Sequence, residues 1–123
     1  MKDEKARPAD LKNRTKQFAL RVIRVYCSLP RTGAPHILGG QLLRAGTSVG
    51  AHYREGIRSR SDAEFVSKIE GALQELEESG YWLELLVEGG IVPQRRLANL
   101  MGEVDELLAI LTTCAKRAKA RMK

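Results

Sequence analysis

The sequence predicts an all-α fold, an up-down antiparallel four-helix bundle built from a single domain over residues 1–123. Apolar residues recur at three- and four-residue spacing along four successive segments, which is typical of the buried faces of amphipathic helices. Proline, glycine and serine interrupt this spacing at short turns. No segment alternates apolar and polar residues over a useful length, so the sequence predicts no strand.

The four helices are expected over residues 10–29, 35–55, 61–88 and 93–118, followed by a basic C-terminal tail that frays. The third is the longest, and at 1.5 Å per residue it would extend for roughly 40 Å. Its apolar face is expected to comprise Phe65, Ile69, Ala72, Leu73, Leu76, Gly80, Leu83 and Val87.

Residues near the helix ends supply start and stop signals. Asp10 is a candidate N-cap for the first helix, and Pro35 suits the first turn of the second. Gly56 is expected to end the second helix as a left-handed residue, because glycine has no Cβ to oppose a positive φ. Ser61 and Glu64 form the S-x-x-E pattern of a capping box, which predicts the start of the third helix.

Gly46 and Gly50 lie in the stretch LLRAGTSVGAHYREG, inside the predicted second helix. A glycine inside a helix costs about 1 kcal/mol relative to alanine, so two of them need a structural reason. A phosphate-binding loop would need a preceding strand and a break before its helix, yet the apolar spacing continues through both glycines. We therefore predict a helix face thinned so that another backbone can approach closely.

The net charge of +6 is distributed unevenly along the sequence. Residues 61–92 carry eight acidic side chains and one basic side chain, whereas the segments before and after them are basic. One interpretation is a negatively charged partner such as nucleic acid, and the other is complementary charge within the fold or between subunits. Composition alone leaves both interpretations open.

Several classes of protein are not expected. No apolar run approaches the roughly 20 residues of a membrane-spanning helix, and the charged N-terminus lacks the apolar stretch of a signal peptide. Cys27 and Cys114 lie within apolar helical patterns and are expected to be reduced residues of the core or of a groove. We therefore expect a cytoplasmic protein that does not bind membranes.

Basic side chains gather on the first helix and at the junction HYREGIRSRS between the second and third helices. Their guanidinium and ammonium groups could contact the phosphates of RNA or DNA. The competing interpretation is that Arg54 pairs with an acidic residue of the third helix or with a neighbouring subunit, and that Arg58 and Arg60 are simply solvated. No RNA-recognition aromatic pattern or zinc finger accompanies them, so binding would be to backbone and shape. The candidate nucleic-acid contacts are Lys12, Arg14, Lys16, Arg21, Arg24, Arg54, Arg58 and Arg60.

The third helix carries more apolar surface than the core of one bundle requires. An exposed apolar patch beside a polar rim indicates a subunit interface. The residues expected in that interface are Tyr81, Trp82, Leu85 and Leu86.

The sequence offers no catalytic, metal or cofactor site. His52 and Glu55 are three residues apart, but in the reverse of the order that di-metal bundles use, and the predicted core faces hold no carboxylate. Neither cysteine has a histidine and an acid arranged to activate it as a nucleophile. We therefore expect neither an enzyme nor a bound cofactor or metal.

At the second helix the residues also resemble a known family. The stretch QLLRAGTSVGAHYREG, with the L-R-x-A/G-x-S-V/I signature at Leu43 to Val49, is similar to the four-helix bundle protein family. That family was first described from proteins encoded in intervening sequences of bacterial 23S ribosomal RNA genes, and it includes the accessory variability protein of diversity-generating retroelements. The similarity spans roughly residues 11–115 and includes the third-helix pattern F-x-x-x-(I/L)-x-x-A-L-x-E. His52 departs from it, since many relatives have asparagine there.

The resemblance implies a small bundle that assembles into a homopentameric, barrel-like ring, with a retroelement member that binds nucleic acid and its reverse transcriptase through basic surface. Together with the charge pattern, it predicts a non-enzymatic oligomeric protein that contacts RNA or DNA electrostatically. The alternative is an oligomeric scaffold that binds another protein. In that case the acidic face formed by Glu70, Glu77 and Glu84 would direct partner capture or assembly.

Overall fold

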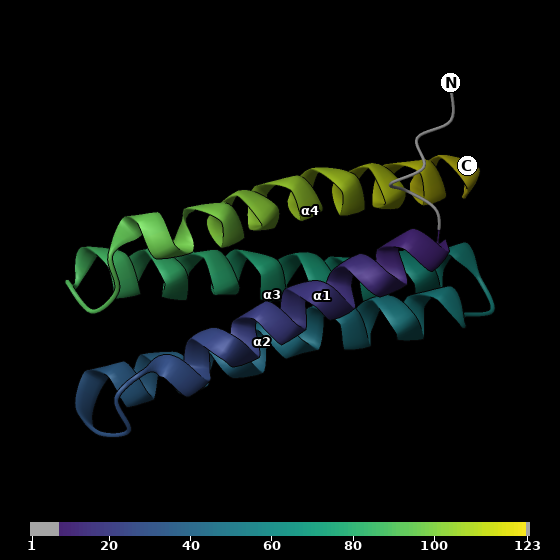
Figure 1. The fold of residues 1–123 in the computed structure, drawn as a ribbon. Helices are drawn as coiled ribbons and strands as arrows, with labels where there is room; N and C mark the ends of the chain where they lie inside the picture. The colour runs from purple at the N-terminus through teal and green to yellow at the C-terminus, as the bar shows by residue number, and fades with distance from the viewer. Residues whose placement is uncertain (1–7, 123) are drawn as a thin grey trace.

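The computed structural model of the chain describes residues 8–122, which form four helices and no strand. Consecutive helices run in opposite directions and are joined by short turns (Figure 1). The predicted all-α class is confirmed. Within the described residues, no helix is long and apolar enough to cross a membrane. The helices are α1 (Pro8–Ser28), α2 (Gly33–Ile57), α3 (Asp62–Glu88) and α4 (Gln94–Arg121).

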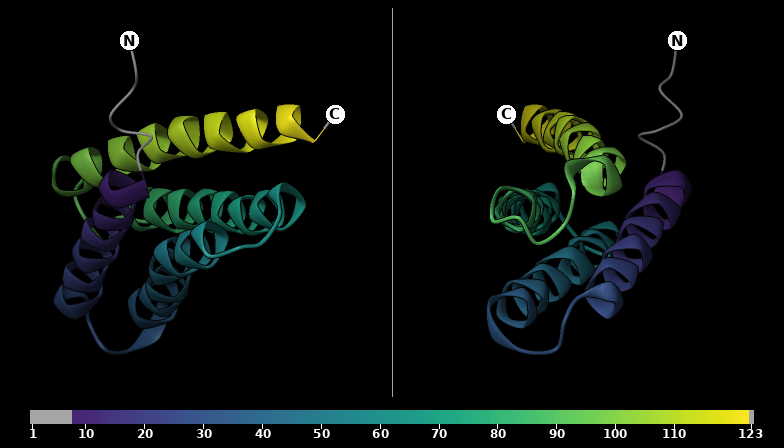
Figure 2. Two further views of the ribbon diagram at one scale, coloured as in Figure 1. Left: turned by 90° about the vertical axis from the view of Figure 1, so that its right-hand side faces the viewer. Right: turned by 60° about the vertical axis from the view of Figure 1, so that its left-hand side comes forward.

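The helices form two antiparallel hairpins, α1–α2 and α3–α4, which pack against each other mainly through α2 and α3. The axes of the two hairpins are inclined to one another (Figure 2), and the direct contact between α1 and α4 is small. The beginning of α1, the α2–α3 turn and the end of α4 all lie at one end of the molecule (Figure 1). Three segments that are far apart in the sequence therefore share that end.

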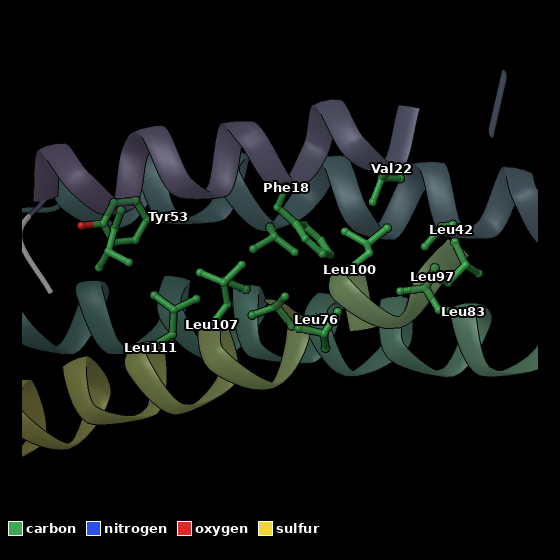
Figure 3. Close-up of a cluster of buried hydrophobic side chains, with 14 of the residues drawn as sticks. Phe18, Val22, Leu42, Tyr53, Leu76, Leu83, Leu97, Leu100, Leu107 and Leu111 are labelled. Carbon is green, nitrogen blue, oxygen red and sulfur yellow. The ribbon is translucent and has the colours of Figure 1, made fainter. Parts of the chain in front are cut away.

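The core between the hairpins consists mainly of leucine side chains (Figure 3). Each such side chain contributes roughly 1.5–3 kcal/mol when it is fully buried. Burial also raises the pKa of Tyr53 to about 12, because a low-polarity environment disfavours the phenolate. The largest fully buried side chains are those of Tyr53, Phe18, Leu11, Leu42, Ile69, Leu76, Leu83, Leu86, Leu107, Leu111, Val22 and Val49.

The two glycines of α2 face α1 at very close range. A Cβ atom on Gly46 would lie 2.8 Å from a methyl carbon of Val22, closer than real Cβ contacts. A Cβ atom on Gly50 would lie 3.2 Å from the hydroxyl oxygen of Thr15, which is itself buried and donates a 2.7 Å hydrogen bond to the Leu11 carbonyl. The missing side chains thus let α1 lie directly on the backbone of α2.

The helix ends differ from the predicted ones at three places. Asp10 lies within the first turn of α1, which already includes Pro8, so it is not the N-cap. Gly56 does not end α2; it is buried inside the helix and faces α3, where a Cβ atom on it would lie 3.4 Å from a methyl carbon of Ile69. The basic segment expected to fray after residue 118 is helical as far as Arg121.

The predicted capping box of α3 is present in a modified form. Ser61 is the N-cap, and its hydroxyl oxygen accepts a 3.1 Å hydrogen bond from the Glu64 N–H. The Glu64 carboxylate accepts from the N–H of Arg60 at 2.9 Å, one residue earlier than the usual partner. Two N–H groups near the helix start are therefore satisfied.

The buried face of α3 is rotated from the predicted one. Phe65, Leu73 and Val87 are only half-buried, whereas Leu86 and Ser79 are fully buried. The Ser79 hydroxyl donates to the Glu75 carbonyl at 2.8 Å, which satisfies it within the core. Because α3 packs against both α2 and α4, its buried face is set by two neighbours and not by its most apolar stripe.

Replacing Gly46 with alanine should destabilise the protein, although alanine favours helix. The new methyl group forces Val22 aside, and such overpacking costs about 1–3 kcal/mol, against roughly 1 kcal/mol gained in helix propensity. Gly40→Ala on the same helix is the matched control, since nothing lies within 4 Å of its Cβ position, and it should stabilise the fold. Urea unfolding measures both. Equal effects of the two substitutions would contradict the close contact.

Candidate nucleic-acid interface

Arg14 on α1 is engaged by carboxylates of α4. Its guanidinium donates to Glu103 at 2.8 and 3.0 Å, and it also pairs with Glu106. The hydrogen bond with Glu103 raises the pKa of Arg14 above its ordinary value. The side chains of Arg14 and Glu103 are only 22% and 15% exposed, so this pair closes the narrow contact between α1 and α4. Arg14 is accordingly the predicted nucleic-acid contact least available to a phosphate.

The other candidate cations of α1 form no ion pair with any described residue. Lys12, Lys16 and Arg24 are exposed, and Arg21 is half-buried. Arg21 lies two turns beyond Arg14 on the same side of the helix, whereas Lys12 and Lys16 lie on the other side of the buried stripe. The first helix therefore presents scattered cations and not one continuous patch.

The other predicted arginines lie at the junction of α2 and α3: Arg54 in the last turn of α2, and Arg58 and Arg60 in the turn that follows. Arg58 is the C-cap of α2, and its N–H donates to the Glu55 carbonyl at 3.2 Å, while the Ser59 N–H donates to the Gly56 carbonyl at 3.0 Å. Ser59 donates from its hydroxyl to the Gly56 carbonyl at 2.6 Å, which fixes the turn. Arg54, Arg58 and the exposed Arg60 form no ion pair with any described side chain. Arg54 forms no ion pair with an acidic residue of α3, so that part of the competing expectation is not met, and its pairing with a neighbouring subunit stays a prediction.

The end of α4 adds cations that the sequence interpretation missed. Lys116 and Arg117 are exposed and without an ion pair within residues 8–122. Lys119 pairs with Glu70 at 2.9 Å, and Arg121 pairs with Asp62 at 3.0 Å. Continuation of α4 into the segment that was expected to fray brings these side chains beside the α2–α3 turn. The sequence signal for this continuation of α4 is the spacing of the alanines in AKRAKAR, which is typical of a helix.

We call the unpaired cations at this end of the molecule the basic end. An open hollow of about 470 Å³ lies there, lined by Arg60, by Arg121 with its partner Asp62, and by Phe65 and serine residues. Guanidinium groups, hydroxyl groups and an aromatic face are the groups that proteins use to hold single-stranded nucleic acid. The basic end consists of Lys12, Arg54, Arg58, Arg60, Lys116 and Arg117.

Acidic side chains are arranged in two ways. On the side of α3 that faces α2, Glu75 and Glu78 contact Arg44 of α2. Glu55 of α2 contacts Lys68 of α3, and this ion pair lowers the pKa of Glu55. On the outer face of α3, Glu77 and Glu84 form no ion pair with described residues, whereas Glu70 does. Within the predicted acidic face, Glu70 is therefore partly neutralised.

The structure separates the residues expected at a subunit interface. Leu86 is 0% exposed and belongs to the core, so its assignment to an exposed patch is wrong. Tyr81 is 53% exposed, and its ring lies 5.2 Å from that of Trp82. Trp82 and Leu85 are half-buried, and Trp82 packs against the core. Residues that adjoin in sequence project in different directions because each helical step turns by about 100°.

His52 packs between α2 and α3. Its Nε2 atom lies 3.9 Å from Glu75, and its buried Nδ1 has no hydrogen-bond partner in the described structure. Gly71 provides room for the ring, since a Cβ atom there would lie 3.0 Å from Nδ1. Cys27 is exposed and lines a small hollow of about 100 Å³ with Tyr26 and His36, Cys114 is half-buried, and no disulfide joins the two cysteines.

With four antiparallel helices and no strand among its described residues, the chain is a small all-α helical bundle. The sequence profile described as 23S rRNA-intervening sequence protein matches residues 8–113. The chain belongs to this family. A crystal structure of a protein with unknown function from the S23 ribosomal protein family of Bacteroides thetaiotaomicron superposes with a TM-score of 0.83 and 30% sequence identity, covering 89% of this chain and 97% of that one. No curated protein matches the sequence.

Arg14→Met should lower the free energy of unfolding by about 1–2 kcal/mol, because hydrogen bonds to charged groups in half-buried settings contribute on that order. Arg24→Met is the matched control: Arg24 is exposed and has no ion pair among the described residues, so the change should stay within about 0.5 kcal/mol. Chemical unfolding of both variants measures the difference. Equal stabilities would show that the Arg14 pair does not hold α1 against α4.

Proposed function

We propose that this chain is a non-enzymatic, cytoplasmic, oligomeric protein that contacts the sugar-phosphate backbone of RNA or DNA through its basic end. The observation that carries the proposal is the group of cations without an ion-pair partner among the described residues at one end of the bundle: Lys12, Arg54, Arg58, Arg60, Lys116 and Arg117. Arg14, Arg44 and Lys68 are instead held by carboxylates. Cations left free are available to phosphates.

Backbone binding follows from the physics of such a surface. Each phosphate neutralised by an arginine or lysine releases a condensed counterion, which favours association at low salt. Phe65 in the adjoining hollow offers an aromatic face to an unstacked base, so single strands should bind better than duplexes. No base-specific contact is part of the proposal.

Oligomerisation would multiply the basic end. The family resemblance supports a homopentameric ring, in which several copies of the basic end could engage one nucleic-acid strand. Linked sites bind with a higher effective concentration and so raise the overall affinity without any new contact. Trp82 and Leu85, half-buried on α3, and Ile37, 64% exposed on α2, are apolar surface that another copy could cover.

A labelled single-stranded RNA of roughly 20 nucleotides should bind in an anisotropy titration at ~50 mM salt and weaken by about 50-fold at ~200 mM, as expected for about four phosphate contacts. The double variant Arg58→Glu, Arg60→Glu should lose about tenfold or more at the lower salt. Arg95→Glu, Arg96→Glu reverses two exposed arginines at the opposite end and should change affinity by less than about threefold. Circular dichroism checks the fold of each.

Equal losses in the two double variants would mean that only total charge matters and would overturn the assignment to the basic end. Loss confined to Arg21→Glu, Arg24→Glu would place the contact on α1 instead. Absence of binding at both salt concentrations would reject the nucleic-acid function.

Light scattering coupled to size-exclusion chromatography tests the assembly. The chain has a mass of 13.7 kDa, and a ring should elute with a mass about five times as large. Leu85→Glu places a charge in the half-buried apolar surface of α3 and should reduce the mass. A wild-type chain that is monomeric at micromolar concentration would contradict the ring.

A further inference from the structure

A groove of about 420 Å³ runs between α3 and α4 on the outer side of the second hairpin. Its floor is apolar, and its rim carries one aromatic ring and several carboxylates. The floor is formed by Gly80, Met101, Val104 and Leu108. The rim is formed by Glu77, Tyr81, Glu84 and Asp105.

The groove exists because of the residue at its centre. Gly80 has no side chain, and a Cβ atom there would lie 3.4 Å from a methyl carbon of Val104, so any larger residue would begin to fill the floor. Tyr81 stands beside it with 53% of its surface exposed. A half-exposed tyrosine next to an apolar hollow is the kind of residue that contributes most at protein interfaces.

The charge of the rim is negative and uncompensated. Glu77, Glu84 and Asp105 form no ion pair with residues 8–122, and no lysine or arginine lines the groove. The acidic row on α3 is neutralised only further along, where Lys119 meets Glu70. An apolar floor between free carboxylates is complementary to an apolar stripe flanked by cations.

We propose that the α3–α4 groove docks a basic amphipathic helix of a partner protein. Apolar side chains on one face of that helix would lie against the floor and Tyr81, and lysines or arginines on its flanks would meet Glu77, Glu84 and Asp105. This arrangement is the helix-in-groove mode of recognition, with charge complementarity that fixes the orientation. The proposal does not depend on nucleic-acid binding, which uses the cationic surface.

The first helix of a second copy is a competitor for this groove. A docked helix needs two or more apolar side chains about one turn apart on one exposed face. On α1 the exposed Ile23 lies three residues from the half-buried Leu20 and next to Arg24, so this face of a second copy could also enter the groove. The large exposed hydrophobic residues among residues 8–122 are on different helices or at a helix end. They are Ile23 on α1, Ile37 on α2, Tyr81 on α3 and Met122 after α4.

The test uses a fluorescein-labelled helical peptide of roughly 18 residues, with leucines at i, i+4 and i+7 spacing on one face and lysines on its flanks. Anisotropy at ~50 mM salt should show saturable binding to the full chain. A peptide of the same composition with leucines dispersed around the helix should bind about tenfold more weakly, because it cannot place its apolar side chains in the floor together.

Protein variants locate the contact. Glu77→Gln, Glu84→Gln should weaken peptide binding by about fivefold or more, and Tyr81→Ala by about tenfold. The matched control is Glu55→Gln, Glu78→Gln, which removes the same charge from carboxylates that contact Lys68 and Arg44 away from the groove. It should leave binding within about twofold of wild type. Circular dichroism and elution volume verify the fold and assembly of every variant.

Three results would overturn the proposal. Equal binding of the two peptides, or equal losses in the two glutamine double variants, would show only long-range attraction to an acidic segment. A fall in oligomeric mass on Tyr81→Ala, together with failure of the peptide to bind wild type, would make the groove an interface between copies. If the peptide does not bind and every protein variant keeps the oligomeric mass of the wild type, the groove does not dock a basic amphipathic helix.

Discussion

The arrangement of this molecule depends on the contact between α1 and the backbone of α2. Gly46 brings Val22 against α2 at a distance that a side chain on the glycine would prevent, and Gly50 leaves a Cβ position only 3.2 Å from the Thr15 hydroxyl oxygen. This contact fixes how α1 lies along α2, and α1 reaches α4 only over a narrow area. Because that meeting is narrow, one ion-pair cluster centred on Arg14 closes it.

The distribution of charge follows from this geometry. Carboxylates that lie between helices hold Arg14, Arg44 and Lys68, so much of the charge noted in the sequence is used within the fold. Among the described residues, unpaired cations gather at the basic end and unpaired carboxylates line the α3–α4 groove. Other unpaired cations are scattered along α1, at Lys16, Arg21 and Arg24, and at the start of α4, at Arg95 and Arg96. The uneven charge of the sequence therefore agrees with both interpretations: some charges pair within the fold, and others are left for a charged partner.

Local signals predicted the helices, their number and the thinned face of α2, because spacing, capping and glycine chemistry act over one or two turns. Features that depend on neighbouring helices were not predictable in the same way. The sequence predicts Gly56 as the end of α2, but the residue is buried within the helix and faces Ile69 of α3. Leu86 is predicted at the surface because nothing local shows that α2 and α4 both cover α3. The ion pair between Arg14 and Glu103 joins residues 89 positions apart in the chain, so the periodicity of the sequence cannot reveal it.

The central claim is that unpaired cations at one end of the bundle, and not the total charge of the chain, form the nucleic-acid surface. Hydrogen–deuterium exchange measured with and without single-stranded RNA tests it most directly, since it maps contact along the whole chain. The account predicts slower exchange around residues 54–62 and 115–121, with the middle of α3 unchanged. Protection spread evenly over all helices, or centred on α1 near Arg21 and Arg24, would contradict it.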